Sequence, residues 1–142
     1  MLINTKFLGN IEIEETNVIR FENGLPGFNT LHEFVLLPVE GNEDLSYMQS
    51  VQDAGICFVM ISPFLIIEDY EINISEETFE NLKIEKLEDI CLYSLLTITE
   101  NIKDMTANLA GPIVINASNN QGTQEILNDN KYGIKYKLYR EE

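Results

Sequence analysis

The sequence predicts an all-β, mainly antiparallel fold: a compact, β-barrel-like single domain over residues 1–142, with one or two short helices. Three observations predict it. Short apolar-rich segments recur along the chain, and turn residues separate most of them. The spacing between these segments is too short for the crossover helices that parallel sheets need. No linker rich in proline, glycine or serine divides the chain.

An amphipathic strand pair is expected at the N-terminus. Residues 11–14 alternate isoleucine with glutamate, which is typical of a strand with one face in water. Gly9 and Asn10 precede this strand, and such a pair suits a two-residue hairpin turn. The sequence therefore predicts a partner strand within residues 2–8.

Five further strands are expected in the first half of the chain. They span residues 17–22, 33–39, 46–51, 56–62 and 70–74. Pro38 has no backbone N–H for a ladder hydrogen bond, so its strand is expected to end there or to lie at an edge.

One helix is expected next. Ser75 suits the N-cap position, and two glutamates follow it, where a helix N-terminus favours negative charge. Phe79 and Leu82 then fall on one face, and the helix is expected to end near Lys83.

The last third of the chain predicts four more strands, over residues 89–99, 112–118, 123–127 and 134–139. The first of them is apolar enough to be buried on both faces. The loop over residues 119–122 suits a hairpin connection with Gly122 at a positive φ.

Acidic groups dominate the charge of the chain. It has 9 Lys and Arg against 24 Asp and Glu, which gives a formal net charge of −15. Such a field repels nucleic acid and attracts a basic partner; alternatively, it serves solubility alone. The N-terminus shows no signal peptide, and no segment approaches the roughly 20 apolar residues that span a bilayer. These observations predict a cytoplasmic protein that does not bind membranes.

Motifs of enzymatic chemistry are absent from the sequence. His32 is the single histidine, and no nucleophile elbow or glycine-rich phosphate-binding motif occurs. We therefore expect no enzyme activity, no cofactor and no metal. The alternative is a small β-barrel that binds a ligand, or a hydrolase that uses His32 and carboxylates. Cys57 and Cys91 show no zinc-like spacing and indicate reduced thiols, although a disulfide between them stays open.

Two charged segments suggest binding surfaces. Glu68, Asp69 and Glu71 surround Tyr70, so this segment either meets a basic partner with Tyr70 as an aromatic anchor or is a solvated strand start. The tail over residues 131–140 interleaves lysine and arginine with tyrosine. Stacking of nucleic-acid bases is one interpretation, but strand alternation with Ile134, Tyr136 and Leu138 facing inward explains the pattern more simply.

One corner of the chain, FENGLPGF at residues 21–28, is unusually rich in conformational constraints. Gly24 and Gly27 permit positive φ, and Pro26 fixes its own φ. We interpret the corner as a tight turn that directs Phe21 and Phe28 into a core.

Four stretches together resemble the FliW family of bacterial flagellar assembly factors. They are residues 20–28, 33–39, 59–71 and 106–129, in the order of the family, and the likeness runs over roughly 2–139. Gly111, before Pro112, departs from the family pattern. The motif residues carried over, with a structural role expected, are Phe21, Asn23, Gly24, Pro26, Gly27, Phe28, Asn108, Pro112 and Asn116.

The resemblance implies a non-catalytic, β-barrel-like protein that binds two proteins in the cytosol. One is flagellin before its export, and the other is CsrA, a small basic RNA-binding protein that represses flagellin translation. Binding lowers the RNA affinity of CsrA, and flagellin competes for the same molecule. We expect a monomer, with Glu68, Asp69, Tyr70 and Glu71 contributing to the partner surface.

Overall fold

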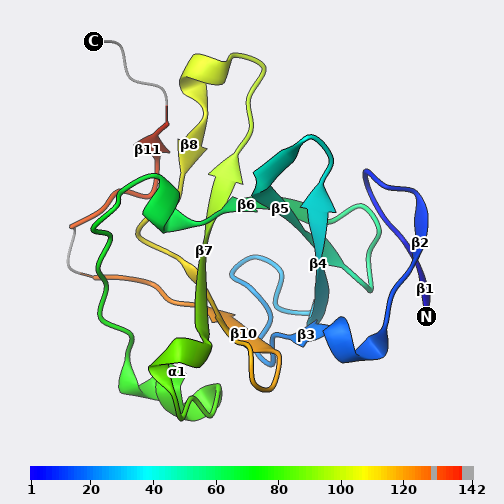
Figure 1. The fold of residues 1–142 in the computed structure, drawn as a ribbon, viewed down its shortest axis with the longest axis horizontal. Coiled ribbons are helices and arrows are strands. Elements are labelled where there is room, and N and C mark those ends of the chain that lie inside the picture. Colours follow the sequence, from blue (N-terminus) through cyan, green and yellow to red (C-terminus); the bar gives the residue numbers. More distant parts are fainter. Residues whose placement is uncertain (129–130, 139–142) are drawn as a thin grey trace.

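The protein is a closed β-barrel in the computed structural model, which describes residues 1–128 and 131–138 (Figure 1). The strands are β1 (Leu2–Asn4), β2 (Asn10–Glu12), β3 (Ile19–Arg20), β4 (Glu33–Val39), β5 (Asn42–Ser50), β6 (Cys57–Ile61), β7 (Ile90–Thr97), β8 (Thr106–Ala107), β9 (Ile113–Asn116), β10 (Gln121–Gln124) and β11 (Tyr136–Lys137). The α-helix is α1 (Glu76–Asn81), and the short 3-10 helices are η1 (Glu15–Asn17), η2 (Pro63–Leu65), η3 (Leu87–Asp89) and η4 (Ile102–Asp104).

The main sheet closes through β7. Its strand order is β11-β8-β7-β6-β5-β4-β3-β10-β9, and β7 pairs with β9 as well as with β6. All of these pairs are antiparallel except β3 with β10, where Arg20 lies opposite Gln121 in a parallel pair. The predicted fold class, a mainly antiparallel barrel with few short helices, is confirmed.

Large apolar side chains fill the interior of the barrel. Phe34, Met48 and Met60, on β4, β5 and β6, are fully buried. The register places Met48 opposite Phe58, and Phe21 packs edge-on against Phe34 with ring centroids 5.3 Å apart. Burial of each such side chain contributes about 1.5–3 kcal/mol, so the interior is a packed core that holds the outer surface in one shape.

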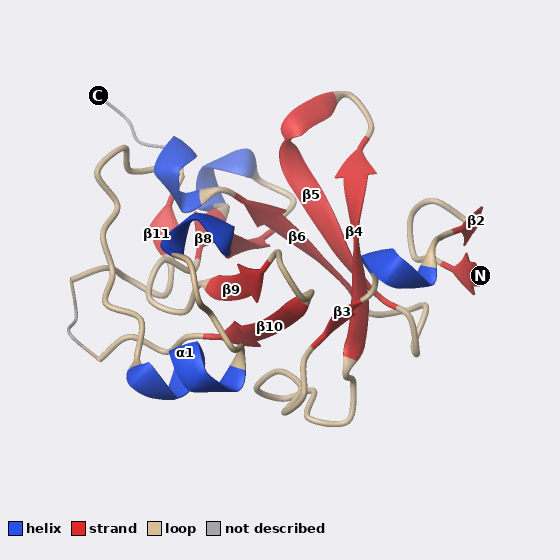
Figure 2. Ribbon diagram, turned by 60° about the horizontal axis from the view of Figure 1, so that its bottom comes forward, coloured by secondary structure: helices blue, strands red, loops and turns tan. Residues whose placement is uncertain are grey.

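The N-terminal hairpin covers the outer face of β4 and β5. Ile3 and Ile13 pack there with Val35 and Leu37 in a second, smaller core, at the side of the barrel remote from α1 (Figure 2). The hairpin is confirmed, but its predicted two-residue turn is wrong. Asn4 pairs with Asn10, so the loop spans residues 5–9. The Thr5 side chain closes it by donating a hydrogen bond to the Gly9 carbonyl, 2.7 Å away.

The strand containing Pro38 has the predicted bounds. Its partner β3 pairs only with Glu33 and Phe34, so Pro38 lies in the half of β4 that has β5 as its single neighbour. The register shifts between Pro38 and Val39. A residue without a backbone N–H is tolerated there because no second strand needs to accept a hydrogen bond from it.

The predicted helix is confirmed. Ser75 is its N-cap, and the Ser75 hydroxyl accepts a hydrogen bond from the Thr78 N–H at 3.2 Å. Thr78 and the C-cap residue Leu82 are buried, and Phe79 is half-buried, as expected for an amphipathic helix. Both ends of α1 are held from the barrel. Glu125, directly after β10, accepts a 2.7 Å hydrogen bond from Ser75 N at the start of the helix. Asn116 on β9 donates a hydrogen bond to the carbonyl of Leu82 at the end of the helix.

Three predictions in the connecting segments are wrong. Residues 70–74 form no strand, because the segment has no neighbouring strand to pair with. Gly122 lies inside β10 without a positive φ, which occurs instead at Asn120 (φ 55°). β7 is mostly half-buried rather than buried on both faces.

The tail also differs from the alternation predicted for it. Its strand shrinks to β11, and Ile134, expected to face inward, is 67% exposed. Tyr139 and Arg140 lie outside the described residues.

The two cysteines are free thiols. Cys57 lies opposite Gln49 on the outer face of the barrel, whereas Cys91 packs against the interior core. The disulfide that the sequence left open is therefore absent. Burial raises the pKa of the Cys57 thiol to about 11, although nearby Lys6 lowers it, so this thiol stays protonated at neutral pH.

Candidate protein-binding surface

The acidic segment follows η2 and has a fixed backbone. Pro63 is buried, and its carbonyl accepts hydrogen bonds from Ile66 N at 3.1 Å and Ile67 N at 2.9 Å. Tyr70 N then donates to the Ile67 carbonyl at 3.0 Å. These successive turns place Glu68, Asp69 and Glu71 in solvent.

Tyr70 does not face a partner, and its expected role as an exposed anchor is corrected. The side chain is only 4% exposed, and its hydroxyl donates a 2.6 Å hydrogen bond to the Leu109 carbonyl. Its ring contacts Tyr132, with centroids 4.6 Å apart, and meets Phe64 edge-on at 5.9 Å. A tyrosine is stable inside when its hydroxyl finds an acceptor, so Tyr70 fixes the acidic segment to the barrel.

Tyr70→Phe is expected to lower the free energy of unfolding by about 1–2 kcal/mol, because the Leu109 carbonyl then loses a buried donor. Urea denaturation measures the loss. The matched control is Tyr47→Phe, because Tyr47 is only half-buried and stacks on Phe7 at 5.1 Å. A loss no larger for Tyr70→Phe than for this control would contradict the assigned role.

Two apolar side chains that the sequence did not single out lie beside the carboxylates. Phe64 is 48% exposed and Leu65 is 59% exposed, both on η2. A surface of exposed apolar groups next to charges has the anatomy of a protein interface. No signal in the sequence marks them as exposed, because they belong to the apolar run FLII at residues 64–67.

The FENGLPGF corner directs both phenylalanines into the core. Phe21 is fully buried, and Phe28 packs edge-on against Phe58 at 5.5 Å. Leu25 and Phe28 exchange both of their backbone hydrogen bonds around Pro26 and Gly27. Gly27 has φ +82°, as the third residue of a type II turn requires.

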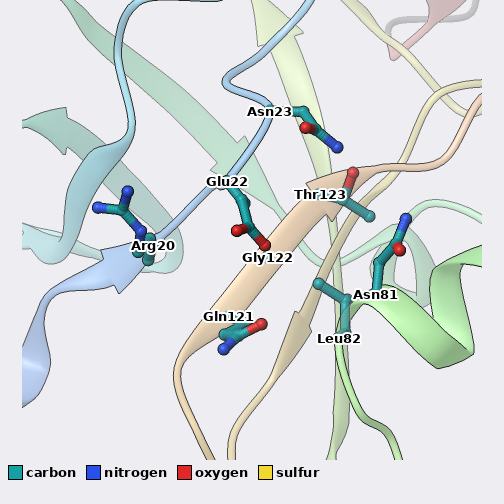
Figure 3. Close-up of a pocket in the computed structure, with 8 residues that line it drawn as sticks. All are labelled: Arg20, Glu22, Asn23, Asn81, Leu82, Gln121, Gly122 and Thr123. Atoms are coloured by element: carbon teal, nitrogen blue, oxygen red, sulfur yellow. The ribbon is translucent and has the colours of Figure 1, made fainter.

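A small polar pocket lies where this corner meets the C-terminus of α1 and strand β10 (Figure 3). Its volume is about 150 Å³. The lining residues are Arg20, Glu22, Asn23, Asn81, Leu82, Gln121, Gly122 and Thr123. His32 is not one of them. Its Nδ1 lies 2.9 Å from the Phe21 carbonyl oxygen, so its side chain makes a hydrogen bond to the backbone of the FENGLPGF corner. Over residues 1–128 and 131–138, no group of three or more His, Cys, Asp and Glu is placed to hold a metal.

Two of the three motif asparagines, Asn108 and Asn116, make hydrogen bonds to the backbone. Asn116 is fully buried, and its Nδ2 donates to the Leu82 carbonyl at 2.8 Å. Its Oδ1 accepts from Ser118 N at 3.0 Å. Asn108 accepts from Ala110 N at 3.1 Å. These contacts satisfy backbone groups at a helix end and in a turn, which is a structural role.

The departure from the family pattern before Pro112 has a physical reason. A Cβ on Gly111 would lie 2.9 Å from Gln124 Nε2 and 3.0 Å from Asn108 Nδ2. The same Gln124 side chain donates a 2.8 Å hydrogen bond to the Gly111 carbonyl. Glycine here lets two polar side chains approach the backbone.

Comparison with known proteins decides the family. The model of the FliW protein family matches residues 2–138. The chain belongs to the FliW family. Flagellar assembly factor FliW of Clostridium novyi (strain NT) is 43% identical over 141 residues, which cover 99% of both chains. The protein of the same name from Clostridium tetani is 40% identical over 142 residues, which cover 100% of this chain and 98% of the other.

A solved FliW structure shares this fold. The crystal structure of the flagellar assembly factor FliW superposes with a TM-score of 0.93 at 41% identity, over 99% of each chain. The FliW fold is therefore shown for the whole barrel. Among the described residues, no helix is long and apolar enough to cross a membrane.

Proposed function

We propose that this FliW-family chain acts as a single unit over residues 1–142, as a cytoplasmic monomer that binds proteins and catalyses no reaction. It holds flagellin before export. It also binds CsrA, and CsrA that is bound to this chain has a lower affinity for RNA. When flagellin accumulates it occupies the chain, CsrA is released, and translation of flagellin stops. Translation resumes once export removes flagellin.

The exposed acidic segment after η2 is the observation that carries this proposal. Its three carboxylates sit on a backbone that Pro63 and Tyr70 hold in place, beside Phe64 and Leu65. A fixed surface avoids part of the ordering cost of association. The net charge of −15 raises the encounter rate with a basic protein and opposes direct binding of nucleic acid.

Capture from lysate at low salt, followed by mass spectrometry, tests the choice of partners. We expect flagellin and CsrA among the proteins that elute as salt is raised, because screening weakens exposed charge pairs over about 10 Å at 0.1 M salt. Recovery of neither protein would contradict the proposal. Linkage adds a second check. Saturating RNA must lower the affinity of CsrA for this chain by the same factor by which the chain lowers the affinity of CsrA for RNA.

Reversal of the acidic segment is expected to weaken CsrA binding. The triple variant Glu68→Lys, Asp69→Lys and Glu71→Lys reverses three exposed charges, each worth about 0.2–1 kcal/mol in a pair, so we expect a roughly tenfold rise in Kd. Titration calorimetry at low salt measures it. The unfolding midpoint should change little, because all three side chains are in solvent.

The matched control reverses three exposed carboxylates at the β4–β5 turn: Glu40→Lys, Glu43→Lys and Asp44→Lys. Both triple variants change the net charge equally. If the two variants weaken CsrA binding by the same factor, the effect comes from net charge and the acidic segment is not the binding surface.

A further inference from the structure

An apolar hollow of about 580 Å³ lies next to the acidic segment. Its lining comes from the turn before β9 and from the chain between β10 and β11. The residues are Ala110, Leu127, Tyr132, Gly133, Ile134 and Lys135. In Figure 1, the segment before β11 and the segment that leads from η2 to α1 run along the same side of the barrel.

Tyr132 joins the hollow to the acidic segment. Its hydroxyl accepts a 2.9 Å hydrogen bond from Glu71 N, and its ring contacts Tyr70 with centroids 4.6 Å apart. Tyr70 is itself fixed by the Leu109 carbonyl, one residue before Ala110 in the wall of the hollow. The same buried ring therefore positions both the carboxylates and the hollow.

The hollow exposes apolar area that the fold does not cover. Ile134 is 67% exposed in its wall. Residues of both charge signs contact Tyr132: Glu71 N donates to its hydroxyl, and Lys131 Nζ lies 5.4 Å from its ring centre. Lys135 is a further cation in the lining. An apolar centre with a charged rim is the arrangement in which one buried anchor contributes most of the binding free energy.

We propose that this hollow receives an apolar side chain of the basic protein partner, whose neighbouring lysine or arginine side chains lie against Glu71 and the carboxylates before it. The occupant is basic because the acidic segment offers three carboxylates on one fixed backbone. Lys135 in the lining repels a basic group, so the lysine or arginine side chains of the partner lie toward Glu71 instead. The inference rests on the proposed function and adds the anchor site to it.

Ile134→Asp tests the anchor directly. We expect the variant to fold as the native chain does, because the side chain is mostly in solvent, and to raise the Kd for purified CsrA at least tenfold in calorimetry. The matched control is Leu87→Asp on η3, which adds the same charge at a residue that is 74% exposed and should leave the Kd within about twofold. Ile134→Ser repeats the test without a charge and is expected to raise the Kd several-fold.

The outcomes separate the two proposals. If CsrA does not bind the native chain, the proposed function fails. If CsrA binds the native chain and both Ile134 variants with one Kd, the anchor site is wrong while the proposed function stands. Loss of flagellin binding with CsrA binding unchanged would overturn the assigned occupant.

Discussion

Gly24→Ala is expected to lower the free energy of unfolding by about 3 kcal/mol or more, because two costs act together. The residue has φ +66°, which an L-amino acid adopts at a cost of roughly 1–2 kcal/mol. Its new Cβ would also lie 2.7 Å from Asn29 Cα and from the Phe28 carbonyl oxygen. Both are backbone atoms of the corner, so relief of the clash requires the turn that seats Phe28 to open.

Gly27→Ala is the matched control in the same corner. Its φ of +82° has the same sign, but no atom lies within 4 Å of a built Cβ. We therefore expect only the backbone cost of about 1–2 kcal/mol. Urea denaturation of both variants gives the difference, and equal losses would contradict the steric account of the corner.

Asn116→Ala is expected to cost about 2–4 kcal/mol, because a fully buried amide that joins β9 to the end of α1 is lost. The Leu82 carbonyl loses its 2.8 Å donor, and Ser118 N and Ser118 Oγ lose their acceptor at 3.0 Å and 2.8 Å. The Leu82 carbonyl keeps Asn119 Nδ2 as a second donor at 2.9 Å, so the expected cost is that of these three hydrogen bonds of Asn116, at about 0.5–1.5 kcal/mol each.

Asn119→Ala separates the effect of burial from that of the hydrogen bond. Asn119 Nδ2 also donates to the Leu82 carbonyl, at 2.9 Å, but the side chain is exposed and water can replace it. We expect a loss of about 1 kcal/mol or less. Hydrogen exchange should show α1 opening more often in the Asn116 variant alone, and similar protection in both variants would contradict the assigned role.

The sequence predicts those parts of the fold that local chemistry determines. A short apolar-rich run predicted β4 at residues 33–39, and the Ser75 cap with its two glutamates predicted α1. It fails where a distant contact decides the outcome. Gly122 suits a turn locally, yet it pairs with Ile115 of β9 inside β10. A built Cβ there would lie 2.8 Å from the Phe21 ring, so only glycine fits.

The candidate surface was predicted only in part, because local chemistry determines one part of it and distant contacts determine the other. Exposure of three carboxylates follows from their charge, and the sequence places them correctly in solvent. Tyr70 was misplaced because its partners, the Leu109 carbonyl and the Tyr132 ring, are 39 and 62 positions further along the chain. The hollow at Ile134 depends on that same long-range packing, so no local sequence pattern predicts it.

Competition between the two partners tests the central claim most directly. Flagellin is titrated at low salt into a preformed complex of this chain with labelled CsrA, and release of CsrA is followed by fluorescence anisotropy. We predict saturable binding of CsrA that raised salt weakens, and its displacement by flagellin. Absence of CsrA binding at low salt, or a ternary complex with no displacement, would contradict it.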